Sequence, residues 1–229
     1  MTSTSSRSKS KSAKNRRSGT KRAKAGRRRS SGGGLFLWGF LGLLVVLFAV
    51  IAVVSRTGGP EMTAAEASGE TLPTFAEGDD PAVGQPAPTL TGQTIDGEAI
   101  TIEPGDGTPK AIAFLAHWCP HCQREVPVVQ QWLEQGGLPE GVEIYAVATG
   151  IDRNRPNFPP QDWLDRENFE VPTLVDGNDA ARNAYGLATY PYWVLVDGDG
   201  EVVERWSGES SEQEIDARIG RLTDGQASG

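Results

Sequence analysis

Cysteine and histidine are scarce in this chain, since its 229 residues contain only two of each. Because a structural zinc site usually takes four protein ligands, two cysteines exclude an all-thiolate site. Both cysteines lie in the segment His117-Trp118-Cys119-Pro120-His121-Cys122. This C-x-x-C spacing is typical of a redox dithiol or of half a zinc site. A disulfide that opens and closes is the simpler interpretation.

Acidic residues are absent from residues 1–34, which hold 12 of the 22 lysines and arginines and no aromatic residue. The rest of the chain keeps 10 basic residues against all 30 acidic ones, a net charge of −20. A segment composed like residues 1–34 cannot bury a core, so we predict a basic disordered arm. Such an arm could bind nucleic acid. Membrane insertion and attraction to anionic lipid explain its charge adequately, so we expect no nucleic-acid partner.

Charge of either sign is absent from residues 35–54, a run of twenty residues. As a helix this run would be about 30 Å long, which matches the hydrocarbon core of a bilayer. The basic arm on its N-terminal side predicts a cytoplasmic N-terminus and an extracytoplasmic domain. A cleaved signal peptide is the alternative, but its apolar region is usually shorter and a small-residue cleavage site follows directly. We therefore predict one uncleaved transmembrane helix in the cell membrane.

Strands and helices are expected to alternate in residues 82–222, which follow a flexible acidic linker at 55–81 and precede a disordered tail at 223–229. The order predicts an α/β fold in which parallel strands are joined by helices and an antiparallel hairpin is added. Asn178 is expected to cap a helix. The expected strands are 111–115, 142–148, 171–175, 192–196 and 201–206, with a pair within 89–102 at the sheet edge; the expected helices are 120–135, 161–168, 178–185 and 210–222.

The dithiol is expected where a buried strand meets a helix. Unpaired N–H groups and the positive helix end favour a thiolate at such a place. We expect Cys119 to be the attacking, more exposed thiolate and Cys122 to be the resolving thiol. A protonated His121 would stabilise the reduced form and make the disulfide a stronger oxidant, although His121 could instead be a solvated turn residue. For His117 we expect a surface or packing role.

The sequence resembles the thioredoxin superfamily, because Trp118, Cys119, Cys122 and Pro127 follow a predicted strand at that superfamily's spacing. The anchor and an additional strand and helix within residues 142–168 are more similar to the TlpA/ResA-like, membrane-anchored thiol-disulfide oxidoreductases. This resemblance covers residues 82–222. It implies a thioredoxin-like fold, a central mixed sheet flanked by helices with an inserted strand and helix.

The resemblance also implies roles for individual residues. Pro191 would be a cis-proline facing the disulfide, and Tyr190 would offer its backbone to a substrate peptide. Trp118 would also contact the substrate. Glu125 matches a glutamate near the dithiol and could accept the proton of Cys122, from which it is three residues away on the same helix face. The alternative for Glu125 is a solvent-facing helix acid.

Two departures from related proteins bear on the direction of the reaction. Ala113 stands where thioredoxin has a buried aspartate, so proton transfer cannot use that position. The dipeptide between the cysteines is Pro-His, as in the oxidant DsbA, instead of the Glu-Pro common in haem-maturation reductants. We therefore expect oxidation of protein thiols, with a membrane partner that recycles the dithiol. The alternative is a TlpA/ResA-like reductant serving cytochrome c maturation or disulfide repair.

Two other classes of function are less consistent with the sequence. A metal site could use Cys119, Cys122, His117 and His121, but four ligands from one turn close a tetrahedron awkwardly. An inert structural disulfide would bridge a two-residue gap and constrain little of the unfolded chain. We therefore expect neither a metal nor a cofactor.

Overall fold

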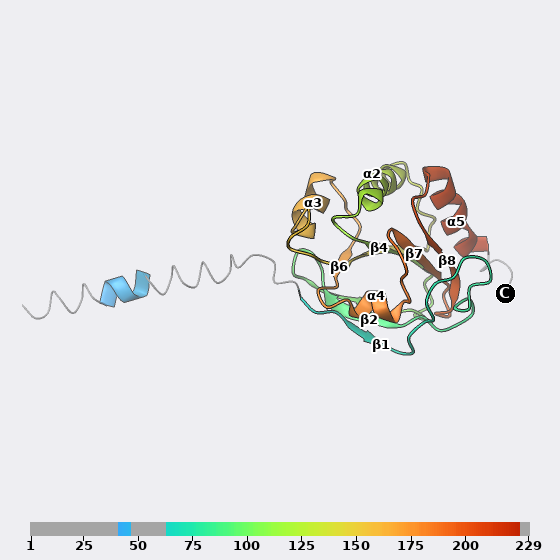
Figure 1. Cartoon of the computed structure of the whole chain (residues 1–229), viewed down its shortest axis with the longest axis horizontal. Helices are drawn as coiled ribbons and strands as arrows, with labels where there is room; N and C mark the ends of the chain where they lie inside the picture. Colours follow the sequence, from blue (N-terminus) through green and yellow to red (C-terminus); the bar gives the residue numbers. More distant parts are fainter. Residues whose placement is uncertain (1–40, 47–62, 225–229) are drawn as a thin grey trace, which may run out of the picture. The chain divides into compact units, whose positions relative to one another are not determined.

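The computed structural model describes residues 41–46 and 63–224 (Figure 1). Residues 41–46 are helical and exposed, and belong to a separate compact unit from the folded domain. Within the two described ranges, no helix is both long and apolar enough to cross a membrane. The predicted arm at 1–34, most of the predicted transmembrane segment and the end of the chain lie outside the described residues.

A five-stranded mixed sheet forms the centre of the domain, in the order β6-β5-β4-β7-β8 (Figure 1). Its middle strand β4 pairs parallel with β5 and antiparallel with β7. Every residue of β4 and β7 is buried, which is why both strands, apart from Lys110 at the start of β4, are apolar in the sequence. The strands are β4 (Lys110–Leu115), β5 (Glu143–Ala148), β6 (Thr173–Val175), β7 (Tyr192–Val196) and β8 (Val202–Ser207).

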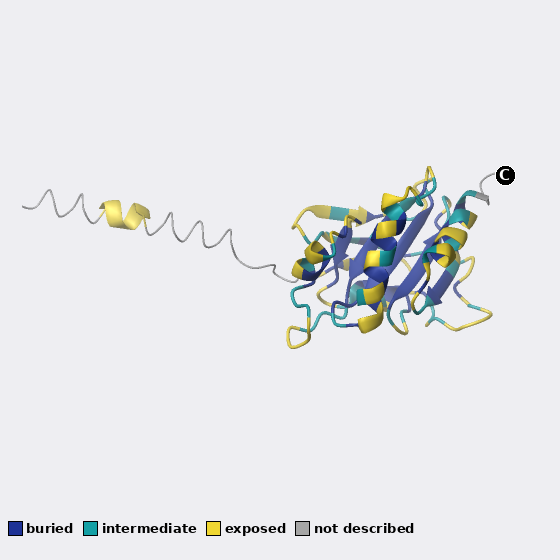
Figure 2. Cartoon of the chain, turned by 90° about the horizontal axis from the view of Figure 1, so that it is seen from above, coloured by how far each residue is buried: buried dark blue, intermediate teal, exposed yellow. Residues whose placement is uncertain are grey.

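Helices and a second sheet cover the two faces of the central sheet, and Figure 2 shows the buried strands between exposed outer surfaces. The helices α2 (Pro120–Glu134), α3 (Pro160–Arg166) and α5 (Glu212–Asp224) lie on one face (Figure 1). The short helix α4 (Ala180–Ala184) lies on the other face with the antiparallel sheet β1-β2-β3, formed by β1 (Glu66–Ser68), β2 (Thr89–Gln93) and β3 (Ala99–Ile102). Because side chains alternate along a strand, neighbouring residues of β4 face opposite layers. Ala113 packs against the layer of α2, α3 and α5, and Phe114 packs against the layer of α4 and the second sheet.

The helix α2 positions the dithiol. It starts directly after Cys119 with Pro120, whose missing N–H costs nothing in a first helical turn. It continues through Pro127 and buries Val126, Val129 and Trp132 against the sheet at helical spacing. The additional pair β5 and α3 follows α2 in the chain, as the resemblance implied.

The expectation of a flexible linker at 55–81 is wrong for its described part. Residues 63–81 pack on the domain, where β1 pairs with β2 and the side chain of Leu72 is buried. Asp80 forms an ion pair with Arg205, whose side chain is fully buried. A buried guanidinium requires a charged partner, and this segment supplies it. A few anchoring residues, such as Leu72 and Asp80, therefore hold the segment on the domain despite its polar composition.

Two smaller expectations also differ from the structure. The side chain of Asn178 does not cap α4; it exchanges hydrogen bonds with the backbone N–H and carbonyl of Ala65, at 3.0 and 3.1 Å. Asp176 instead accepts the N–H groups of Ala181 and Arg182, each at 3.1 Å. The strand pair within 89–102 belongs to the second sheet and not to the edge of the central one, because it pairs with β1.

Candidate active site

The two cysteines occupy different environments at the start of α2. Both are reduced; Cys119 keeps 5% of its surface exposed and Cys122 keeps none. The N–H of Cys119 donates to the carbonyl of Ala116 at 2.9 Å, which fixes the turn between β4 and α2. Burial raises the pKa of the Cys122 thiol, since desolvation disfavours a thiolate. Cys119 is therefore the better placed of the two cysteines to meet another protein, and Cys122 is held protonated behind it.

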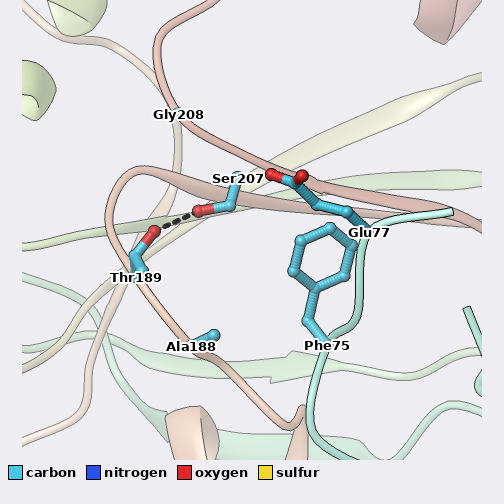
Figure 3. Close-up of a pocket in the computed structure, with 6 residues that line it drawn as sticks. All are labelled: Phe75, Glu77, Ala188, Thr189, Ser207 and Gly208. Atoms are coloured by element: carbon cyan, nitrogen blue, oxygen red, sulfur yellow. Dashed lines mark hydrogen bonds between the residues drawn. The ribbon is translucent and has the colours of Figure 1, made fainter.

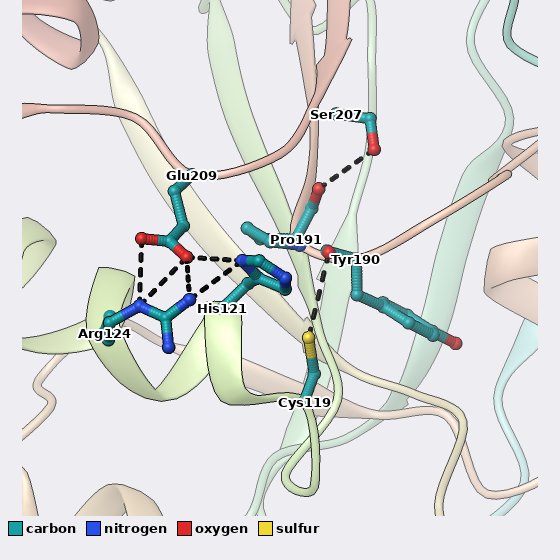
Figure 4. A network of polar contacts seen from close by, with 7 residues as sticks. All are labelled: Cys119, His121, Arg124, Tyr190, Pro191, Ser207 and Glu209. Atoms are coloured by element: carbon teal, nitrogen blue, oxygen red, sulfur yellow. Dashed lines mark hydrogen bonds and ion pairs between the residues drawn. The ribbon is translucent and has the colours of Figure 1, made fainter.

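A loop faces the sulfur of Cys119 (Figure 4). The peptide bond between Tyr190 and Pro191 is cis, as the resemblance implied. The carbonyl oxygen of Tyr190 lies 3.7 Å from Sγ of Cys119. The carbonyl of Pro191 accepts the N–H of Gly208 at 2.9 Å, which ties the loop to the end of β8. The structure thus places the backbone of Tyr190 directly at the dithiol.

Glu125 is buried, so the alternative of a solvent-facing helix acid is wrong. Only 1% of its surface is exposed, and its Oε1 accepts the indole N–H of Trp193 at 2.8 Å. Its Oε2 has no hydrogen-bond partner within residues 63–224. Desolvation raises the pKa of Glu125 to about 8, while the Trp193 hydrogen bond opposes this by favouring the charged form. This carboxyl can hold or release a proton near neutral pH.

His121 belongs to a network of three side chains at the mouth of the site (Figure 4). Its ring nitrogen Nδ1 contacts a carboxylate oxygen of Glu209, and the guanidinium of Arg124 pairs with the same carboxylate. Arg124 and Glu209 hold each other charged, since their hydrogen bond raises the pKa of Arg124 and lowers that of Glu209. Glu209 precedes α5, 88 residues after His121, and no local pattern in the sequence indicates this contact.

Trp118 lies beside the facing loop. Its indole N–H donates to the carbonyl of Gly150 at 2.7 Å, and its ring meets the ring of Tyr190 edge-on at 5.7 Å between centroids. The guanidinium of Arg155 lies 4.1 Å from the centre of the Trp118 ring, a cation–π distance. Trp118 and Tyr190 are thus brought together next to Cys119, and both remain partly exposed.

His117 fixes a loop from a buried position, so of the surface and packing roles expected for it the structure shows packing. It is 1% exposed, and its Nδ1 donates to the carbonyl of Pro156 at 2.7 Å while its Nε2 accepts the N–H of Asp152 at 3.2 Å. Burial lowers the pKa of His117, which favours this neutral form. Because both ring nitrogens are occupied, His117 cannot serve as the fourth ligand of the metal site considered from the sequence.

Comparison with known proteins agrees with this geometry. Residues 83–205 match the AhpC/TSA family. The chain belongs to this family. It is 24% identical over 178 residues to the thiol-disulfide oxidoreductase ResA of Bacillus thuringiensis (strain Al Hakam), covering 78% of this chain and 96% of that protein. It is 29% identical over 133 residues to ResA of Halalkalibacterium halodurans, covering 58% and 73%.

Among solved structures, the chain is similar to MTB DsbF in its mixed oxidized and reduced forms. The identity is 28%, the TM-score is 0.50, and the alignment covers 58% of this chain and 93% of that one. The resemblance to thiol-disulfide oxidoreductases of the ResA kind and the thioredoxin-like α/β fold are confirmed. The chain is an oxidoreductase of the thiol-disulfide class, as the lone cysteine pair indicated.

Proposed function

We propose that this protein oxidises thiols of protein substrates outside the cytoplasm, through the Cys119–Cys122 disulfide. A substrate thiolate attacks Sγ of Cys119, the bond between the two cysteines breaks, and its electron pair passes to Cys122. A second substrate thiolate then attacks the substrate sulfur of the mixed disulfide and releases Cys119. The substrate gains a disulfide, and the dithiol ends reduced by two electrons. The observation that carries this proposal is that Cys119 keeps 5% of its surface exposed, in front of a Cys122 that keeps none.

The leaving sulfur of Cys122 needs a proton, because its buried position disfavours a thiolate. We assign this proton to Glu125, which lies three residues further along the same helix. With its pKa raised to about 8, Glu125 is mostly protonated at pH 7 and can donate directly or through a water. It would take the proton back when the dithiol is oxidised again by a membrane redox partner.

The direction of exchange depends on the charges near Cys119. The guanidinium of Arg124 places a positive charge at the mouth of the site, and a protonated His121 would add a second. A stabilised thiolate makes the disulfide a stronger oxidant. Glu209 offsets these charges. That carboxylate favours the second candidate, a TlpA/ResA-like reductant of substrate disulfides in cytochrome c maturation or disulfide repair. The reduction potential of the Cys119–Cys122 couple in glutathione buffers decides between the two directions.

The location of the enzyme is part of the proposal. The apolar run at 35–54 and the basic arm before it support a single membrane anchor with a cytoplasmic N-terminus. The bilayer is then a partner of the chain, and nucleic acid is not. Protease added to intact cells or spheroplasts should digest the domain that contains Cys119, and digestion only after lysis of the membrane would contradict this orientation.

Trapping tests the assigned roles of the two sulfurs. Cys122→Ser should accumulate mixed disulfides between Cys119 and substrate proteins, visible as adducts on non-reducing gels and lost on reduction. The matched control is Cys119→Ser, which should form far fewer adducts because Cys122 is buried. Equal trapping by both variants, or by neither, would contradict the assignment.

A further inference from the structure

A pocket of about 290 Å³ lies beside the loop that faces the dithiol (Figure 3). Three segments distant in sequence meet there: the N-terminal segment at 63–81, the loop before Pro191, and the end of β8. No residue of this pocket was predicted from the sequence. Its lining residues are Phe75, Glu77, Ala188, Thr189, Ser207 and Gly208.

The pocket is close enough to the reacting sulfur to meet a bound substrate. Ala188 and Thr189 directly precede Tyr190, whose carbonyl lies 3.7 Å from Sγ of Cys119. Successive Cα atoms are about 3.8 Å apart, so the lining starts within one or two residues of that contact. The hydroxyl of Ser207 contacts that of Thr189 and donates to the carbonyl of Pro191 at 3.4 Å. A peptide bonded to Cys119 therefore has its neighbouring side chains within reach of this pocket.

The chemistry of the lining selects one kind of side chain. The Phe75 ring forms one wall and is fixed from behind by Tyr192, at 5.7 Å between centroids. The carboxylate of Glu77 stands over this wall, exposed and without an ion pair or hydrogen bond within residues 63–224. No lining residue is basic. The guanidinium of Arg205 lies 5.8 Å from the centre of the Phe75 ring, but it is buried and its charge is already paired with Asp80. An aromatic wall with an unpaired carboxylate and hydroxyls suits an apolar stem that ends in a cation.

We propose that this pocket binds a lysine or arginine side chain of the protein substrate, next to its reacting cysteine. Phe75 packs against the stem and Glu77 pairs with the charged end. This inference rests on the proposed exchange with protein substrates and adds to it a preference for basic sequences. The net charge of −20 after residue 34 also attracts basic substrates at long range, but only the pocket can select a position next to the cysteine.

Peptide exchange kinetics test the preference. The probes are peptides whose cysteine carries thionitrobenzoate, with lysine, glutamine or glutamate at each of two positions on either side. In the full-length Cys122→Ser protein, Cys119 attacks the peptide sulfur, a new disulfide forms, and thionitrobenzoate leaves with the electron pair and is measured by absorbance. At one position lysine should react about two- to fivefold faster than glutamine, the range of an exposed ion pair. Glu77→Gln should bring this ratio to about one.

The matched control is Glu98→Gln, which removes an exposed acid outside the pocket and should keep the lysine preference. Equal rates for lysine and glutamine, faster reaction with glutamate, or an unchanged ratio in Glu77→Gln would each overturn the pocket assignment. Peptides in which serine replaces the cysteine cannot exchange disulfides, so they measure binding alone. By NMR titration, the lysine peptide should shift Thr189 and Gly208 resonances in the wild type more than in Glu77→Gln. If the resonances shifted equally in both proteins, the pocket assignment would be overturned. If the lysine peptide bound as expected but disulfide exchange were slow, only the proposed function would be contradicted.

Discussion

Replacement of Glu125 by glutamine should remove a large pH dependence from the stability of the reduced protein. Burial raises the pKa of Glu125 to about 8, from an ordinary value of 4.5. Between these two values the folded protein holds a proton that the unfolded chain has released. The free energy of unfolding must therefore fall as pH rises through this window, and it levels off above pH 8.

The magnitude follows from the two pKa values. One pKa unit corresponds to about 1.4 kcal/mol, so Glu125 should cost the folded state about 2–3 kcal/mol between pH 5 and pH 7. Glutamine keeps the size of the side chain and an oxygen that can accept from the indole N–H of Trp193, but it does not titrate in this range. Its amide also adds donors in a buried place, a cost that does not change with pH.

Denaturant unfolding at pH 5, 6, 7 and 8 measures this effect in the wild type and in Glu125→Gln, both kept reduced. The difference in the free energy of unfolding between the two proteins should grow by about 2–3 kcal/mol from pH 5 to pH 7. Titration of the other groups cancels in this comparison. If both proteins lost stability in parallel, the reasoning from burial would be refuted.

Two further perturbations follow from the geometry. A protonated His121 and the carboxylate of Glu209 bear opposite charges near Cys119, so His121→Ala should make the couple more reducing and Glu209→Gln should make it more oxidising. Potentials that move in the same direction would contradict the network. Gly186→Ala should lower the free energy of unfolding by about 2 kcal/mol or more, since Gly186 has a positive φ of 63° and a Cβ there would overlap the carbonyl of Pro73. Gly97→Ala is the control in thermal melts, because Gly97 also has a positive φ, of 83°, but has open space around it. An equal loss of stability in both variants would argue against packing of the N-terminal segment.

Local patterns in the sequence predicted the parts of the site that lie close together in the chain. The buried strand, the cysteine pair and Pro120 at the start of a helix are all contained in residues 110–134. The order of strands and helices then led to the mixed sheet, because crossover and hairpin connections restrict how such strands can pair. Pro191 was found through a family resemblance, since a proline in the sequence does not reveal a cis bond.

Contacts between distant segments could not be predicted in this way. Glu209 reaches His121 across 88 residues, and Phe75 and Glu77 meet the Thr189 loop only after residues 63–81 fold back onto the domain. The composition of those residues suggested a flexible linker, and nothing local indicated that Asp80 neutralises a buried arginine. Side chains that act through tertiary contacts carry no periodic pattern of their own.

Under the proposed mechanism, the buried carboxyl of Glu125 supplies an acid that the central strand does not provide. Ala113 stands where thioredoxin has a buried aspartate, and it lies opposite Trp193 in the β4–β7 pairing. The Trp193 ring stacks on Trp206 at 5.4 Å between centroids and donates to Glu125 from this fixed position. The carboxyl therefore comes from α2, the helix that begins directly after Cys119 and carries Cys122. Under the proposed mechanism, proton donor and leaving sulfur then keep their spacing through a single helical turn, and Trp193 orients the carboxyl from the sheet.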